Sequence, residues 1–356
     1  MPLYVLLIAA IMLIGLPLAG AAAAGLDISA FLEFPPLTRY VHHAEFSWVI
    51  FISIALVDLL LIGAIVYLIQ YRVRSQVEIP PSDISKFPWW GWAGVMICVA
   101  GTILAWTRFE WFRFFQQHTF ILPWAGYILV ANALSVKQSS RCILTENPGR
   151  FILLFPLSTV FWWFFEYLNR YVQNWYYLGI GDFGIAEYTV FASISFSTVL
   201  PAILSTHDVL MTFPLLTKRL THSVSFTISR PRCLSLVVLA LSSLGLALIG
   251  IYPDYLFPLL WISPLLLVPS LQTLFGHDNI FSSIRSGDWR NIVGLALSAL
   301  ICGFFWEMWN YFSLAKWEYA VPFVNHFHIF EMPVLGFGGY LPFGLECLIV
   351  VKLLQI

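Results

Sequence analysis

Two glutamates stand in the most aromatic parts of this apolar sequence, and an asparagine follows each of them three residues later. The pairs are Glu166 with Asn169 and Glu307 with Asn310. Residues three apart on a helix share a face, so each pair presents a carboxyl and an amide group together. A charged carboxylate inside a bilayer costs on the order of 2.5–3.5 kcal/mol, so each acid needs a partner or a proton. Two such acids in one cavity can act as acid and base, or they can only hydrogen-bond neighbouring helices.

A second group of polar residues follows the second pair. His326, His328 and Glu331 form an H-x-H-x-x-E run, and imidazole with carboxylate is a ligand set that suits zinc, iron or copper. The alternative is that His326 and His328 are interfacial side chains without a metal. Glu346 lies inside the last apolar segment, four residues after Pro342, and is a candidate ligand-binding residue.

The composition is that of an integral membrane protein. Hydrophobic residues make up 60% of the chain and charged residues 10%, with a mean hydropathy of +0.82. A soluble domain is about one quarter charged. The formal net charge of −1 leaves no large basic surface, so a nucleic-acid partner is not expected. The five cysteines have no metal-ligand spacing.

The apolar segments predict an all-α polytopic membrane protein with about ten transmembrane helices, each near the roughly 20 residues that a bilayer requires. They lie near 3–25, 47–71, 88–106, 119–136, 151–169, 187–205, 233–251, 255–274, 291–311 and 334–356. Thirteen Lys and Arg residues lie on the side of the membrane that contains the C-terminus and the connections that follow the even-numbered helices. Five lie on the other side. The positive-inside rule then places both termini in the cytoplasm.

The polar landmarks recur in order, which predicts an internal duplication. Glu166, Asn169, Trp175, Glu187 and Pro201 correspond to Glu307, Asn310, Trp317, Glu331 and Pro342, at offsets between 141 and 144. We therefore expect a first four-helix unit at 86–210 and a second at 233–356. The N-terminal helix pair at 1–75 includes an interfacial segment at 26–46. Units with an even helix count share one orientation, and repeat-built proteins often form their site at the repeat interface.

The C-terminal pattern also supports a comparison with known families. Trp306-Glu307-Met308-Trp309-Asn310, Lys316-Trp317, Phe330-Glu331-Met332-Pro333, Gly336 and Pro342-Phe343 together resemble bacterial polytopic membrane proteins that have no assigned activity. This resemblance covers mainly the last 60 residues, and it implies a bacterial inner membrane as the location. Glutamates at helix ends in duplicated units are also similar to those of small membrane carotenoid cyclases. The cyclases' paired glutamates beside a proline are not reproduced here, because Phe330 and Met332 flank Glu331.

These observations favour a protein that handles a lipid or isoprenoid-like ligand in an outward-facing cavity within the membrane. Aromatic walls hold an apolar chain or a cationic intermediate. The expected catalytic residues are Glu166, Glu307 and Glu331, and the expected ligand-binding residues are Asn169, Asn310, Trp175, Trp317 and Glu346. Two alternatives remain open, an accessory subunit of a larger membrane complex and a proton-coupled transporter. No cofactor is assigned, and the residues do not decide whether the protein is an enzyme.

Overall fold

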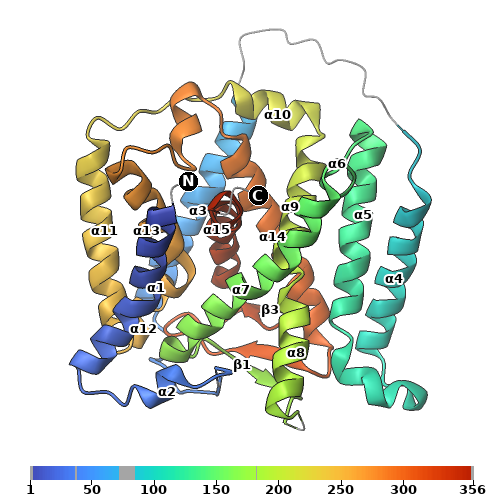
Figure 1. Cartoon of the computed structure of the whole chain (residues 1–356), viewed down its shortest axis with the longest axis horizontal. Helices are drawn as coiled ribbons and strands as arrows, with labels where there is room; N and C mark the ends of the chain where they lie inside the picture. The colour runs from blue at the N-terminus through green and yellow to red at the C-terminus, as the bar shows by residue number, and fades with distance from the viewer. Residues whose placement is uncertain (1–2, 37, 72–84, 182, 354–356) are drawn as a thin grey trace.

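The computed structural model describes residues 3–36, 38–71, 85–181 and 183–353. Within these residues the chain is predominantly helical, in agreement with the all-α prediction, and has four short strands. Figure 1 shows the long helices side by side, with α10 at one end of the bundle and β1 at the other. Arg72, Arg74 and the ends of the predicted segments 1–75, 233–356 and 334–356 lie outside the described residues.

Eight helical segments of the described chain are long and apolar enough to cross a membrane. They are α1 (Leu3–Ala23), α3 (Trp48–Gln70), α4 (Trp89–Trp106), α7 (Pro148–Val172), α8 with α9 (Ile185–Phe196 and Val199–Met211), α11 (Pro231–Leu248), α14 (Arg290–Tyr311) and η3 with α15 (Val334–Gly339 and Tyr340–Leu353). Each is long enough to cross the hydrocarbon core of a bilayer, and each has few charged residues. The fold is therefore that of a polytopic membrane protein.

Two further segments complete the predicted set. The 3₁₀ helix η1 (Glu110–His118) and α5 (Ile121–Ser139) meet at a bend of 70° and together make a ninth candidate span. Helix α13 (Pro258–Leu274) has 17 residues, or about 26 Å at 1.5 Å per residue, and contains Pro264 and Pro269. All ten predicted segments thus lie on helices, and ten membrane crossings stay a prediction.

The remaining helices are short connections. They are α2 (Ser29–Leu32), α6 (Ile143–Glu146), α10 (Pro214–Thr221), α12 (Pro253–Leu256) and the 3₁₀ helix η2 (Ser282–Ser286). Residues 26–46, the predicted interfacial segment, contact parts of both predicted units. His43 Nδ1 lies 2.6 Å from Asp254 Oδ1, and the Arg39 amide donates to Gln173 Oε1 at 2.9 Å. These contacts fasten the N-terminal helix pair to the rest of the bundle.

Two antiparallel strand pairs lie between the long helices. β1 (Trp175–Leu178) pairs with β2 (Lys316–Tyr319), and β3 (His328–Ile329) pairs with β4 (Met332–Pro333). In the first pair Trp175 lies opposite Tyr319 and Tyr177 lies opposite Trp317. β1 follows α7 and β2 follows α14, so this small sheet joins the chain segments that leave the two glutamate-bearing helices.

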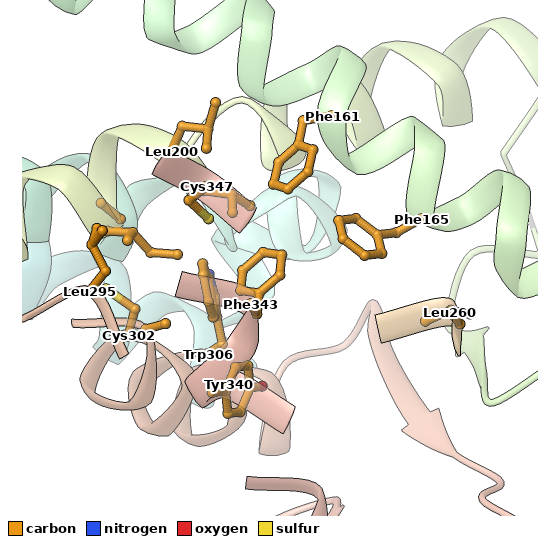
Figure 2. Packing of buried hydrophobic residues seen from close by; sticks show 14 of the residues in the cluster. Phe161, Phe165, Leu200, Leu260, Leu295, Cys302, Trp306, Tyr340, Phe343 and Cys347 are labelled. Atoms are coloured by element: carbon orange, nitrogen blue, oxygen red, sulfur yellow. The ribbon is translucent and has the colours of Figure 1, made fainter. Parts of the chain in front are cut away.

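An aromatic core fixes α7, α14 and α15 against one another (Figure 2). The Phe343 ring of α15 lies 5.5 Å from the Phe165 ring and 5.8 Å from the Phe161 ring of α7, and 6.2 Å from the Trp306 ring of α14. Such ring pairs add about 0.5–1.5 kcal/mol each beyond the burial of their area. Gly344 allows the approach, because a Cβ there would lie 2.1 Å from the carbonyl oxygen of Leu295.

Candidate functional site

Glu166 is fully buried near the end of α7, and three aromatic side chains donate to one of its oxygens. Oε1 accepts from the indole Nε1 of Trp162 and of Trp175, both at 3.1 Å, and from the Tyr177 hydroxyl at 2.6 Å. Trp162 lies one turn earlier on the same helix, whereas Trp175 and Tyr177 come from β1. The acid therefore ties the strand to the helix that precedes it.

Glu307 has the same role in α14. It is fully buried, and its Oε1 accepts from the hydroxyl groups of Tyr319 in β2 and Tyr340 in α15, both at 2.8 Å. The indole of Trp317 donates to the Tyr319 oxygen at 2.9 Å and extends the network by one residue. Each predicted acid thus has an aromatic set of donors from its own helix–strand segment or a neighbouring helix.

An exchange of residues on the two helices explains one difference between the two sets. Gly303 lies one turn before Glu307, at the position that Trp162 has relative to Glu166. A Cβ at Gly303 would lie 2.4 Å from the Tyr340 ring. The absent side chain leaves the space that Tyr340 fills, so a tyrosine from α15 donates where a tryptophan of the same helix donates in the first set.

The two asparagines shape the turns that lead into the strands. Asn169 Nδ2 donates to the Trp175 carbonyl at 2.9 Å, and its Oδ1 accepts from the Asn174 amide at 2.7 Å. Asn310 Nδ2 donates to the Trp317 carbonyl at 2.8 Å, and its Oδ1 accepts from the Trp317 amide at 2.9 Å. Both asparagines therefore act on the backbone, and they position Trp175 and Trp317 rather than touch the cavity described below.

We expect Asn310→Ala to lower the free energy of unfolding by about 2 kcal/mol, because two backbone groups of the partly buried Trp317 lose their partner. Thermal unfolding of the purified protein in detergent measures this change. Asn325→Ala is the matched control, since Asn325 is exposed and bonds only His328 in the described chain. Equal losses for the two variants would contradict the turn-forming role of Asn310.

A cavity of about 140 Å³ lies between these two sets of residues. Its wall includes all five aromatic donors to the acids, namely Trp162, Trp175, Tyr177, Tyr319 and Tyr340, and also Trp306 and Phe343. None of the predicted acids or asparagines is part of the wall. The carboxylates lie one layer behind it, and of the predicted ligand-binding residues Trp175 and Trp317 reach the cavity.

Glu166 and Glu307 accept hydrogen bonds from neutral phenol groups of the two strands. Burial raises the pKa of Tyr177 and of Tyr319 well above the usual range of a phenol, so both groups keep their protons and donate. One oxygen of each acid carries these bonds. The other oxygen, Oε2 of Glu166 and of Glu307, is buried without a hydrogen-bond partner among the described residues.

The far wall of the cavity contains residues that the sequence analysis did not select. His118 ends η1, and its ring stacks on Phe191 with centroids 3.7 Å apart. Gln117 Nε2 donates to the Gly179 carbonyl at 2.9 Å, just beyond β1. Both residues precede the bend between η1 and α5, where no repeat or helical spacing marks them. The one feature of the sequence that could have indicated them is the polar pair Gln117-His118 within an aromatic segment.

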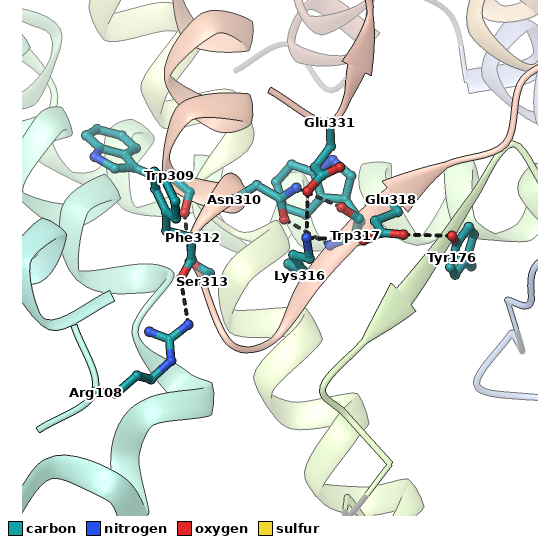
Figure 3. A network of polar contacts seen from close by, with 10 residues as sticks. All are labelled: Arg108, Tyr176, Trp309, Asn310, Phe312, Ser313, Lys316, Trp317, Glu318 and Glu331. Atoms are coloured by element: carbon teal, nitrogen blue, oxygen red, sulfur yellow. Dashed lines mark hydrogen bonds and ion pairs between the residues drawn. The ribbon is translucent and has the colours of Figure 1, made fainter. Parts of the chain in front are cut away.

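Glu331 belongs to an ion-pair network at the edge of the cavity (Figure 3). Lys316, which lines the cavity, lies 2.5 Å from Glu331 Oε1 and 3.1 Å from Glu318 Oε1. Tyr176 donates to Glu318 Oε2 at 2.8 Å. Burial and then this bond raise the pKa of Tyr176 to about 12, so the phenol stays neutral. Glu331 thus neutralises a lysine and does not join Glu166 and Glu307 behind the aromatic wall.

The histidines of the predicted metal site have other neighbours. The His326 ring packs 4.3 Å from Phe46, and His328 Nε2 lies 3.2 Å from Asn325 Oδ1. Within the described parts of the chain, no group of three or more His, Cys, Asp or Glu side chains is arranged to hold a metal ion.

Glu346 is fully buried in α15, away from the cavity wall. Its Oε1 accepts from the backbone amide of Leu265 at 3.2 Å, one residue after Pro264 of α13. This bond ties α15 to the proline-containing helix. The predicted ligand-binding residues therefore divide between the cavity, the turns and this separate helix contact.

Comparison of the chain with protein-family models, with curated proteins and with solved structures finds no match.

Proposed function

We propose that this membrane protein binds the apolar end of a lipid or isoprenoid-like molecule in the aromatic cavity between α7, α8, α14 and α15. One observation carries the proposal: fourteen indole, phenol and phenyl rings line the wall, and five of them donate hydrogen bonds to two buried acids. A wall of this kind removes apolar surface from water and has few groups that would need polar partners.

The size of the cavity favours the end of a chain over a whole lipid. An apolar cavity near 150 Å³ holds a molecule about the size of benzene, and this cavity measures about 140 Å³. A terminal ring or one isoprene unit would fill it, and the rest of the molecule would extend into the bilayer.

The buried acids give the cavity a preference for positive charge. A cation is attracted to the faces of tryptophan and tyrosine rings, and donation to a carboxylate increases the electron density of the donating ring. Oε2 of Glu166 and of Glu307 is left to exchange a proton. These groups support a ligand that carries or develops a positive centre near the rings.

The strand register supports the proposed duplication. Trp317 and Tyr319 lie 142 positions after Trp175 and Tyr177. Because Trp175 pairs with Tyr319 and Tyr177 pairs with Trp317, exchanging the two strands leaves the pairing unchanged. A pair related by a local two-fold axis has this property. We therefore propose that units 86–210 and 233–356 are copies whose interface forms the cavity.

The positive-inside rule supports the orientation of this site. The end of the bundle with β1 carries the five Lys and Arg residues of the minority side, which are Arg39, Arg108, Arg113, Arg170 and Lys316. The cavity would then open toward the outer face of a bacterial inner membrane, with both termini in the cytoplasm.

Filling the cavity tests the proposal. Ala192 lines the cavity from α8, so Ala192→Trp should occupy the space that the ligand needs. We expect the purified wild-type protein to retain an apolar compound that mass spectrometry of an organic extract detects, and the variant to lose at least nine tenths of it.

Ala64→Trp is the control, because Ala64 is exposed on α3. Its extract should match that of the wild type, and both variants should remain monodisperse. Identical extracts from the wild type and the folded Ala192→Trp variant would overturn the proposal, as would a wild-type extract that contains only bulk membrane lipids.

A further inference from the structure

A second and larger cavity lies at the other end of the bundle, between α11 and α13. Its volume is about 380 Å³, within the range of small-molecule sites. Leu234 and Val238 of α11 and Leu265, Leu266 and Pro269 of α13 form its apolar wall. The connection from α10 to α11 and the 3₁₀ helix η2 surround its mouth, at the end of the molecule opposite β1 (Figure 1).

Three polar side chains in this wall are already bonded within the protein. Ser270 Oγ donates to the Leu266 carbonyl at 2.6 Å, and Thr273 Oγ1 donates to the Pro269 carbonyl at 2.9 Å. Asn279 Nδ2 donates to Thr273 Oγ1 at 2.9 Å. The interior therefore offers an apolar surface, which suits an acyl chain better than a polar solute.

The mouth carries positive charge. Arg285 lines the cavity and is exposed, and Arg230 and Arg232 are exposed at the start of α11. Among the residues that the structure describes, no carboxylate lines the cavity. The acids nearest to Arg285 in the sequence are Asp278 and Asp288. Asp278 is exposed, and Asp288 forms an ion pair with Arg290 at 2.7 Å. A guanidinium group recognises phosphate oxygens with paired hydrogen bonds.

We propose that this cavity binds an anionic phospholipid, with one acyl chain between α11 and α13 and the phosphate on Arg285. The lipid can enter sideways from the bilayer, because Leu234, Leu241 and Leu244 of α11 are exposed to the surroundings of the bundle. Basic groups beside membrane helices bind acidic head groups in this way. The site is separate from the aromatic cavity and does not depend on its function.

The test compares the binding of two lipids to purified protein by native mass spectrometry. Dioleoylphosphatidylglycerol should bind about fivefold more tightly than dioleoylphosphatidylcholine, since one basic group near the head group contributes about 1 kcal/mol. Arg285→Gln should reduce this preference, because phosphatidylglycerol then loses more affinity than phosphatidylcholine, whose choline group already offsets the charge of its phosphate. Val238→Trp should weaken the binding of both lipids, because it fills the slot for the chain.

Arg113→Gln removes the same charge from an exposed position at the β1 end and should leave both affinities unchanged. Arg285 is exposed, so its variant should fold normally. Equal binding of the two lipids by the wild type would overturn the proposal, and so would an unaltered preference in Arg285→Gln. Displacement of the lipid by millimolar inorganic phosphate would also overturn it, because the acyl chain would then contribute nothing.

Discussion

Replacing Glu166 by alanine should destabilise the protein more than any other change at the aromatic site, by about 3–5 kcal/mol. The substitution leaves the Trp162, Trp175 and Tyr177 donors buried without their acceptor. It also opens a void behind the cavity wall, which adds to the loss. Thermal unfolding in detergent, followed by tryptophan fluorescence, reports both stability and the environment of the wall.

The relative losses of stability in a small series of variants distinguish the hydrogen-bonding role of Glu166 from a general effect of lost charge. Glu307→Ala should cost less than Glu166→Ala, because two donors rather than three lose their acceptor. Glu166→Gln should cost less than either, since its remaining oxygen still accepts. Glu187→Ala, at an exposed glutamate of α8 whose ion pair with His118 is 4.0 Å long, should cost less than about 1 kcal/mol. A Glu166→Ala protein as stable as Glu187→Ala would contradict the hydrogen-bonded wall.

Gly344→Ala should have the second-largest effect, with a loss of about 2–3 kcal/mol from overpacking. The new methyl group would lie 2.1 Å from the Leu295 carbonyl, which is backbone and can move only with α14. The two helices would separate, and the Tyr340 hydroxyl would move away from Glu307. Ligand retention should fall together with the unfolding temperature.

Gly63→Ala is the matched control for this prediction. Gly63 lies on α3, where an added Cβ meets nothing within 4 Å. The same change there should leave the protein as stable as the wild type or raise its stability by up to about 1 kcal/mol through helix propensity. If Gly344→Ala behaved like Gly63→Ala, the close approach of α14 and α15 would be wrong.

The helices were largely predictable from the sequence, because a long apolar segment has few other ways to satisfy its backbone in a bilayer. Their exact ends and the bend between η1 and α5 were not. The short α13 shows why the number of crossings is harder to predict. Its apolar residues continue into α12 and the preceding turn, so hydropathy alone gives 255–274 as a single span.

The pairing of Glu166 with Asn169 and of Glu307 with Asn310 pointed to the region around the aromatic cavity, since polar residues in an aromatic segment are costly unless bonded. The spacing did not reveal that Asn169 and Asn310 act on the backbone of the following turn. The spacing also could not predict the hydrogen bond from Tyr340 of α15 to Glu307. Tyr340 reaches Glu307 only because Gly303 of α14 leaves space for its ring. Contacts of this kind depend on packing between distant segments.

The sequence analysis also grouped Glu331 with the two buried acids, because Glu331 belongs to the same series of repeated landmarks, where it corresponds to Glu187. Its partner is Lys316, fifteen residues earlier and on β2. No local pattern pairs these residues, since the turn between β3 and β4 brings them together. His118 was missed for the same reason: its place in the wall follows from the bend before α5.

A density map of the purified protein in lipid nanodiscs, at a resolution that shows side chains, tests the central claim most directly. It should place Glu166 and Glu307 behind one shared aromatic wall, with their indole and phenol donors in contact and elongated density in the cavity. If either carboxylate instead pointed into the acyl chains, or if the two acids lay behind separate surfaces, the shared site would be disproved.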